Sequence, residues 1–94
     1  MMRRRLSEDE IRERLIGREG WEHREGCVCK RFTFPNFEMA LDFVNRVGAV
    51  AETHDHHPDI RLGWGYAEIA FTTHDSGGIT EKDFELVREI DEVR

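Results

Sequence analysis

The sequence contains no long apolar run, which excludes a membrane-spanning helix. Such a helix needs about 20 consecutive apolar residues, and no stretch of the 94 residues approaches that length. The N-terminus also lacks the apolar core of a secretory signal peptide. We therefore expect a cytoplasmic protein that does not associate with a membrane.

Cysteine is scarce, because Cys27 and Cys29 are the only two in the chain. Their side chains would point the same way on a strand, and neighbouring cysteines on one strand rarely form a well-shaped disulfide. A reducing cytoplasm would also keep them as thiols. The pair lacks the spacing of a zinc site. We interpret both as small strand residues.

Basic residues are fewer than acidic residues. The chain has 14 Lys and Arg against 20 Asp and Glu, giving a formal net charge of -6. An acidic surface repels phosphate backbones, so we expect no nucleic-acid ligand. The only basic run, Arg3 to Arg5, is followed by Glu8, Asp9 and Glu10. We interpret it as a solvated terminus.

The length predicts one domain spanning residues 1–94. A chain of this size buries only one small core, and association with further copies would add buried area. Open sheet edges are also often covered by another copy. We expect a homodimer or a homotetramer.

The first half of the sequence predicts a helix, a hairpin and a second helix. Ser7 and Glu10 form a capping box before a helix that ends at Gly17. A hairpin is predicted over residues 21–34, with its turn at residues 24–26. The second helix should start at the N-cap Asn36 and end near His54, because Pro58 prevents its continuation. Its expected apolar stripe is Phe37, Ala40, Leu41, Val44, Val47, Gly48 and Ala51.

The second half predicts another hairpin and a last helix. Apolar residues alternate at Ile60, Leu62 and Trp64, and again from Ala67 to Phe71, which places a turn at Gly65–Tyr66. Residues 75–78 should form a loop, and Thr80 with Asp83 a capping box. The order is helix, two strands, helix, two strands, helix. It indicates an α+β fold, a four-stranded antiparallel sheet with helices packed on one face.

Four of the five histidines lie between positions 54 and 74. If the two strands of the second hairpin pair, Pro58 and His74 meet at one edge of the sheet, and His56, His57 and His74 converge. Imidazoles suit acid–base catalysis because their unperturbed pKa lies near neutrality. Two other interpretations stay open: a polar helix end with surface histidines, and a metal site with His54, His56 and His57 as ligands.

The string Glu52-x-x-x-His56-His57-Pro58, followed by Trp64 and by Thr73-His74, resembles the pterin-4a-carbinolamine dehydratase family. The similarity runs from about Trp21 to the C-terminus. The resemblance implies a four-stranded antiparallel sheet with helices on one face. It also implies His56, His57 and His74 as catalytic residues, and further contacts to the substrate from Glu52, Asp55, Pro58, Trp64 and Thr73.

The resemblance also implies a reaction. The family removes water from the 4a-hydroxy-tetrahydropterin that aromatic amino-acid hydroxylases leave, and this needs no redox cofactor and no metal. Trp64 stands where many members have Tyr; an indole can stack on a pterin but offers no hydroxyl. Glu68 stands where some members carry another histidine. Two alternatives remain: a protein-interaction module, because some members act as dimerisation partners of a transcription factor, and a dehydratase for another pterin, such as a molybdopterin-related compound.

Overall fold

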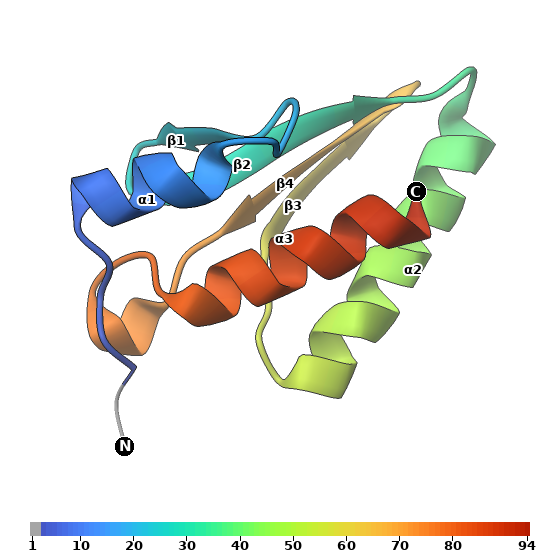
Figure 1. The fold of residues 1–94 in the computed structure, drawn as a ribbon. Coiled ribbons are helices and arrows are strands. Elements are labelled where there is room, and N and C mark those ends of the chain that lie inside the picture. Colours follow the sequence, from blue (N-terminus) through green and yellow to red (C-terminus); the bar gives the residue numbers. More distant parts are fainter. Residues whose placement is uncertain (1–2) are drawn as a thin grey trace.

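The computed structural model describes residues 3–94, and there three α-helices cover one face of a four-stranded antiparallel sheet (Figure 1). This confirms the predicted α+β class and element order. The elements are α1 (Glu8–Leu15), β1 (Glu22–Arg24), β2 (Cys27–Thr33), α2 (Phe37–His54), β3 (Asp59–Gly63), β4 (Tyr66–Phe71), the short 3-10 helix η1 (His74–Ser76) and α3 (Glu81–Val93).

The strand order is β1-β2-β4-β3, so β4 lies between β2 and β3. Asp59 at the start of β3 is opposite Ala70 near the end of β4. The segment that leaves α2 therefore enters the sheet at the same edge where the chain leaves β4. This register brings residues 54–58 and residues 72–75 together, although most of a hairpin separates them in sequence.

Helix α2 begins and ends where the sequence predicts. The Asn36 side chain accepts a hydrogen bond from the Met39 backbone N–H at 2.9 Å and so caps the first turn. At the other end Asp55 adopts a left-handed conformation with φ 48°, which short polar residues tolerate better than most. The His56 N–H then donates to the Ala51 carbonyl at 3.1 Å. Residues 55–57 thus leave the helix in a bonded turn.

The core lies between the inner face of the sheet and the helices. The inward positions of β2 and β4, such as Val28, Phe32, Ile69 and Phe71, are almost fully buried. Between them the outward positions carry polar or small residues, as the period of two predicts. Helix α2 packs on this face through Ala40, Phe43, Val47 and Ala51. Helix α3 contributes Phe84, Leu86, Val87 and Ile90.

The predicted apolar stripe of α2 is partly wrong. Phe37 and Leu41 are 42% and 39% exposed, whereas Phe43, which was not in the stripe, is fully buried. The apolar residues of this helix extend around more than one side, and one side is enough to cover the sheet. Periodicity alone does not identify which side faces the core.

The predicted turn of the second hairpin is also displaced. The turn is formed by Trp64 and Gly65, and Tyr66 already belongs to β4. Gly65 has φ 78°, a left-handed conformation that glycine adopts without strain. Trp64 is therefore not a strand residue, and it is 73% exposed.

The N-terminal arm is bound along the loop that follows β4, so residues 3–6 are more than a solvated terminus. The Leu6 N–H donates to the Ile79 carbonyl at 2.8 Å. The Ser76 hydroxyl donates to the Arg3 carbonyl at 2.7 Å. These bonds attach the arm to η1 and to the start of α3.

Two further sequence predictions concern the cysteines and the membrane. Cys27 and Cys29 lie side by side on the outward face of β2 as free thiols, and burial raises the pKa of the Cys27 thiol. Both are small strand residues, as expected. Between residues 3 and 94, no helix combines the length and the apolar character that crossing a membrane requires.

The core makes a prediction about stability. Replacing fully buried Phe43 by Ala should lower the free energy of unfolding by about 3–5 kcal/mol, because contacts are lost and a cavity is left. Replacing Ile16, which is 80% exposed, should change it by less than about 0.5 kcal/mol. Urea unfolding followed by circular dichroism measures both values. Equal midpoints for the two variants would contradict the assigned core.

Candidate active site

A cleft of about 430 Å³ opens at the edge of the sheet where α2 ends and β4 ends. This volume falls within the roughly 300–1,000 Å³ of small-molecule sites. His56, His57 and His74 all line it, together with Asp55 and Thr73. The structure thus brings the three histidines around one space, as the strand register requires. His54, Arg3, Thr72 and Asp75 complete the lining.

His56 is the most firmly held of the three histidines. Its Nε2 atom lies 2.6 Å from Oδ1 of Asp83, and its side chain is only 11% exposed. The ring also lies parallel to Phe71, with 6.2 Å between the ring centres. Because a carboxylate only accepts hydrogen bonds, Nε2 carries a proton, and in a neutral ring Nδ1 is left as the basic atom.

Asp83 is fully buried and accepts hydrogen bonds from three directions. Besides His56, its Oδ2 atom accepts from the Thr73 hydroxyl and from the Thr80 backbone N–H, each at 2.8 Å. The Thr80 hydroxyl lies 2.8 Å from that of Thr73. Since Thr73 already donates to Asp83, Thr80 must donate to Thr73. The buried charge is therefore surrounded by donors.

His57 has a more open environment. Its Nε2 atom pairs with a carboxylate oxygen of Glu52, which lies in the last turn of α2. The two side chains are 54% and 77% exposed, and exposed ion pairs contribute little to stability. Glu52 thus orients the His57 ring from outside the cleft.

His54, the last residue of α2, contacts α3. Its Nε2 atom pairs with Glu89, and its Nδ1 atom lies 2.9 Å from Nζ of Lys82. His54, His56 and His57 therefore each face a different carboxylate and do not point at a common centre. Between residues 3 and 94, no three His, Cys, Asp or Glu side chains are grouped so that they could hold a metal ion.

His74 is exposed and begins η1, directly after buried Thr73. Its ring has no hydrogen bond or ion pair to any other residue of the described range 3–94. An exposed imidazole exchanges protons readily with water. Asp55, in its left-handed position at the end of α2, lies on the same cleft.

The structure does not bring Trp64 to the histidines. Trp64 lies at the turn of the β3–β4 hairpin, whereas Pro58 lies at its open end. Trp64 is six positions after Pro58, which corresponds to about 20 Å at the rise of a strand. Within one chain, Trp64 therefore cannot stack on a ring that occupies the histidine cleft. Glu68 is also distant from the cleft, on the outward face of β4, where it pairs with Arg61 at 3.1 Å.

Asp83 is the site residue that the sequence interpretation missed. It was assigned only to a helix cap, and it does bond the Thr80 N–H in that way. Its position in the chain could have indicated this role, because only a short loop separates Thr73-His74 from the start of α3, which therefore begins at the same edge of the sheet. The pairing of Asp83 with His56 joins residues that are 27 positions apart. No local pattern reports such a contact.

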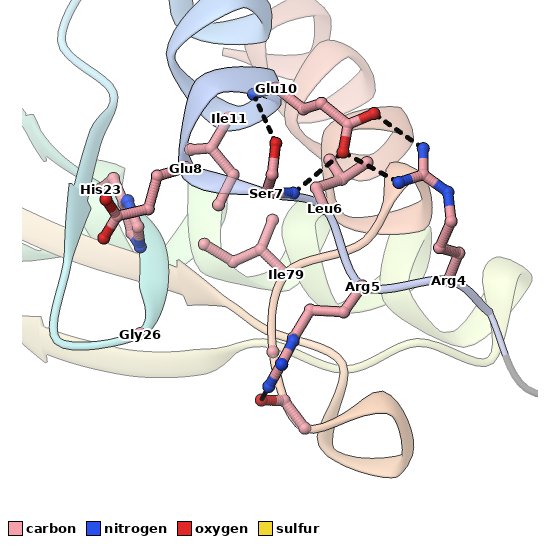
Figure 2. A pocket seen from close by; sticks show the side chains of 12 residues that line it. Arg4, Arg5, Leu6, Ser7, Glu8, Glu10, Ile11, His23, Gly26 and Ile79 are labelled. Atoms are coloured by element: carbon pink, nitrogen blue, oxygen red, sulfur yellow. Dashed lines mark hydrogen bonds and ion pairs between the residues drawn. The ribbon is translucent and has the colours of Figure 1, made fainter.

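A second cavity, of about 540 Å³, lies elsewhere, between the N-terminal arm, α1 and the β1–β2 turn (Figure 2). Leu6, Ile11 and Ile79 form a buried apolar wall. Arg4 and Glu10 face each other through two hydrogen bonds of 2.8 Å, which lower the pKa of the Glu10 carboxyl to about 2. These charges already satisfy each other. The histidine cleft is therefore the better candidate for chemistry.

Comparison with known proteins identifies the family of this chain. The profile of the family described as Pterin 4 alpha carbinolamine dehydratase matches residues 4–93. The chain belongs to the pterin-4a-carbinolamine dehydratase family. The expected resemblance is thereby confirmed over nearly the whole chain.

Two relatives carry the name pterin-4-alpha-carbinolamine dehydratase provisionally. A protein of Roseiflexus sp. (strain RS-1) is 45% identical over 92 residues, which cover 98% of this chain and 99% of the relative. A protein of Sulfurisphaera tokodaii is 40% identical over 90 residues, covering 96% and 97%. Both relatives are therefore matched over nearly their whole length.

Two solved structures share the fold. A protein of Brucella melitensis described as a transcriptional coactivator/pterin dehydratase has a TM-score of 0.89 and 28% identity, covering 95% of this chain and 97% of its own. A pterin dehydratase-like protein identified as a RuBisCO assembly factor in the alpha-carboxysome has a TM-score of 0.63 and 22% identity, covering 78% and 84%. The second likeness shows the fold alone.

The buried network predicts the effect of neutralising Asp83. Asparagine in its place would remove the charge that strengthens these three hydrogen bonds, which should lower the free energy of unfolding by about 1–3 kcal/mol. Asp75→Asn is the matched control, because Asp75 is exposed on η1. Urea unfolding of both variants checks this. The same midpoint for D83N and the wild type would contradict the network.

Proposed function

We propose that the protein dehydrates a 4a-hydroxy-tetrahydropterin to the quinonoid dihydropterin, with His56 as base and His74 as acid. One observation carries the proposal: buried Asp83 holds His56 in the tautomer whose Nδ1 atom accepts a proton, on a cleft shared with His57 and His74. Family membership supplies the class of reaction. A substrate of this kind is produced by pterin-dependent aromatic amino-acid hydroxylases.

The proposed step conserves atoms and electrons. Nδ1 of His56 takes the proton from the ring nitrogen next to the hydroxylated carbon, and the nitrogen electron pair forms a double bond to that carbon. The carbon–oxygen bond breaks, and the hydroxyl leaves as water with a proton from His74. No group is oxidised or reduced, so the reaction needs no redox cofactor.

The two histidines suit these roles for different reasons. The carboxylate of Asp83 stabilises the imidazolium that His56 becomes when it takes a proton, as a buried carboxylate does for other catalytic histidines. His74 is exposed, so water can restore its proton after each turnover. His57, oriented by Glu52, would bind the pterin by hydrogen bonding. Asp55 and Thr73 line the cleft beside these rings, whereas Pro58 is not one of its lining residues.

The molecule also has features of an oligomer, and we propose a homodimer or homotetramer. Phe37, Met39 and Leu41 leave apolar surface of α2 exposed, between 39% and 47% of each side chain. The edge strands β1 and β3 have unpaired sides. Both features are usually covered by another chain.

A second candidate function is a protein-interaction role in the cytoplasm. The Brucella melitensis relative is described as a coactivator as well as a dehydratase, and exposed Trp64 and the apolar surface of α2 offer contacts that the reaction does not use. The dehydratase is preferred because an interaction role gives no reason for the buried His56–Asp83 pair. A different pterin, such as a molybdopterin-related compound, would undergo the same chemistry in the same cleft.

Kinetics on histidine variants tests the reaction. We expect His56→Gln and His74→Ala to lower kcat about 10²–10⁴-fold, the usual contribution of an acid or a base. His57→Ala should raise KM more than it lowers kcat. Glutamine is chosen at position 56 because it keeps an N–H donor for Asp83, whereas alanine would remove one of the three hydrogen bonds to this buried carboxylate.

The assay follows dehydration of synthetic 4a-hydroxy-tetrahydrobiopterin, with a chelator in the buffer because the proposed step uses no metal. His23→Ala is the control, since His23 is exposed on β1 and does not line the cleft. Circular dichroism confirms that each variant is folded. Wild-type kcat in both H56Q and H74A would end the catalytic proposal.

Light scattering tests the assembly. At micromolar concentration the protein should have about two or four times the mass of one chain, because association covers apolar surface that a monomer exposes. Leu41→Glu places a charge on the exposed side of α2 and should reduce the measured mass, whereas Asn45→Glu is a control at an exposed polar position of the same helix. A monomer mass for the wild type would refute the proposed oligomer.

A further inference from the structure

His54 makes two contacts that the proposed reaction does not use. As the last residue of α2, it reaches across to α3, where its Nδ1 atom lies 2.9 Å from Nζ of Lys82 and its Nε2 atom pairs with Glu89. The side chains of His54 and Lys82 are only 19% and 13% exposed.

The contacts define the protonation of the ring. A lysine ammonium group only donates hydrogen bonds, so Nδ1 of His54 must present its lone pair. The proton of the neutral ring is then on Nε2, which donates to the Glu89 carboxylate. His54 is therefore a neutral bridge between a cation and an anion of α3.

The bridge lies next to the His56 contact. Lys82 and Asp83 are neighbours in the first turn of α3, and they bind His54 and His56, which are two residues apart at the end of α2. Only Asp55 lies between the two histidines. Two adjacent residues of α3 thus hold both sides of the turn from which His56 projects.

We propose that His54 is a positioning residue, which fixes the end of α2 against α3 and so keeps His56 at Asp83 in the geometry for proton transfer. The inference rests on the proposed function. Catalysis is sensitive to such placement, because a shift of about 1 Å in a reacting group can cost a hundredfold in rate. In this role His54 does not touch the reacting atoms.

The charges around His54 indicate a variant that should fold. Lys82 also lies 3.6 Å from Glu85, so it keeps a partner when His54 is replaced. The Glu89 side chain is 44% exposed and can be solvated. His54→Leu therefore removes the bridge without burying an unpaired charge. His54→Gln keeps it, because an amide can accept from Lys82 and donate to Glu89.

The first test is kinetic. H54L should lower kcat about tenfold to a hundredfold, and KM should stay within about twofold, because only the placement of the base changes. H54Q should restore most of kcat. His23→Leu, the same substitution at an exposed histidine outside the cleft, should match the wild type. An unchanged kcat in H54L, or a raised KM with unchanged kcat, would overturn the positioning role.

The second test needs no turnover. Nitrogen-15 NMR of the histidine rings should show His54 protonated on Nε2 only. The Nε2–H signal of His56, sheltered by Asp83, should exchange with water faster in H54L than in H23L. A His54 ring protonated on Nδ1, or equal exchange rates, would refute the bridge. An inactive wild type with the expected NMR result would reject the proposed function and leave the His54 bridge standing.

Discussion

The buried carboxylate of Asp83 is the interaction on which both the fold and the site depend. Removing a charge from water costs several kcal/mol unless hydrogen bonds replace the lost hydration. Here three donors do so: Thr73 after β4, Thr80 at the start of α3, and His56 after the end of α2. Its place in the first turn of α3 adds the favourable field of a helix N-terminus. One side chain thus caps a helix, joins three segments and orients a histidine.

This arrangement gives consecutive histidines different properties. His56 is paired with a buried carboxylate, whereas its neighbour His57 is paired with one that is 77% exposed. An ion pair is strong where water is excluded and weak where it is not. His56 is therefore held in one tautomer and one place, while His57 remains free to adjust to a ligand. A base benefits from the first property and a binding residue from the second.

The sequence predicted those parts of the fold that local rules govern. The caps at Ser7 and Asn36 and the end of α2 before Pro58 depend on residues a few positions apart, and the structure confirms them. The convergence of the histidines followed from strand pairing, which the alternating pattern supports. The turn was predicted one residue too late, at Gly65–Tyr66. The alternation of apolar residues continues through Trp64 into the turn, so it does not indicate where the strand ends.

Long-range contacts were beyond such rules. Asp83 bonds His56, which is 27 positions away, and Lys82 bonds His54, which is 28 positions away. In the sequence, the capping pattern at the start of α3 already explained this segment locally, so nothing indicated these contacts. Arg3, Arg4 and Arg5 are exposed, as a solvated terminus predicts. Three arginines indicated a solvated terminus, yet the backbone of this arm bonds Ile79 and Ser76. Main-chain bonding depends little on side-chain type, so composition cannot report it.

The arm contact completes the physical account of the cleft. Each proposed catalytic ring lies outside the α-helices and strands, in a connecting segment that alone would be mobile. His56 is held by α3 through Asp83, and the loop that carries His74 is held between Thr73, buried in the same network, and the arm bonded at Ser76. Irregular backbone allows the rings to converge, and contacts from three distant parts of the chain then keep them in place. Such support is what a proton-transfer site needs, because its geometry must persist between turnovers.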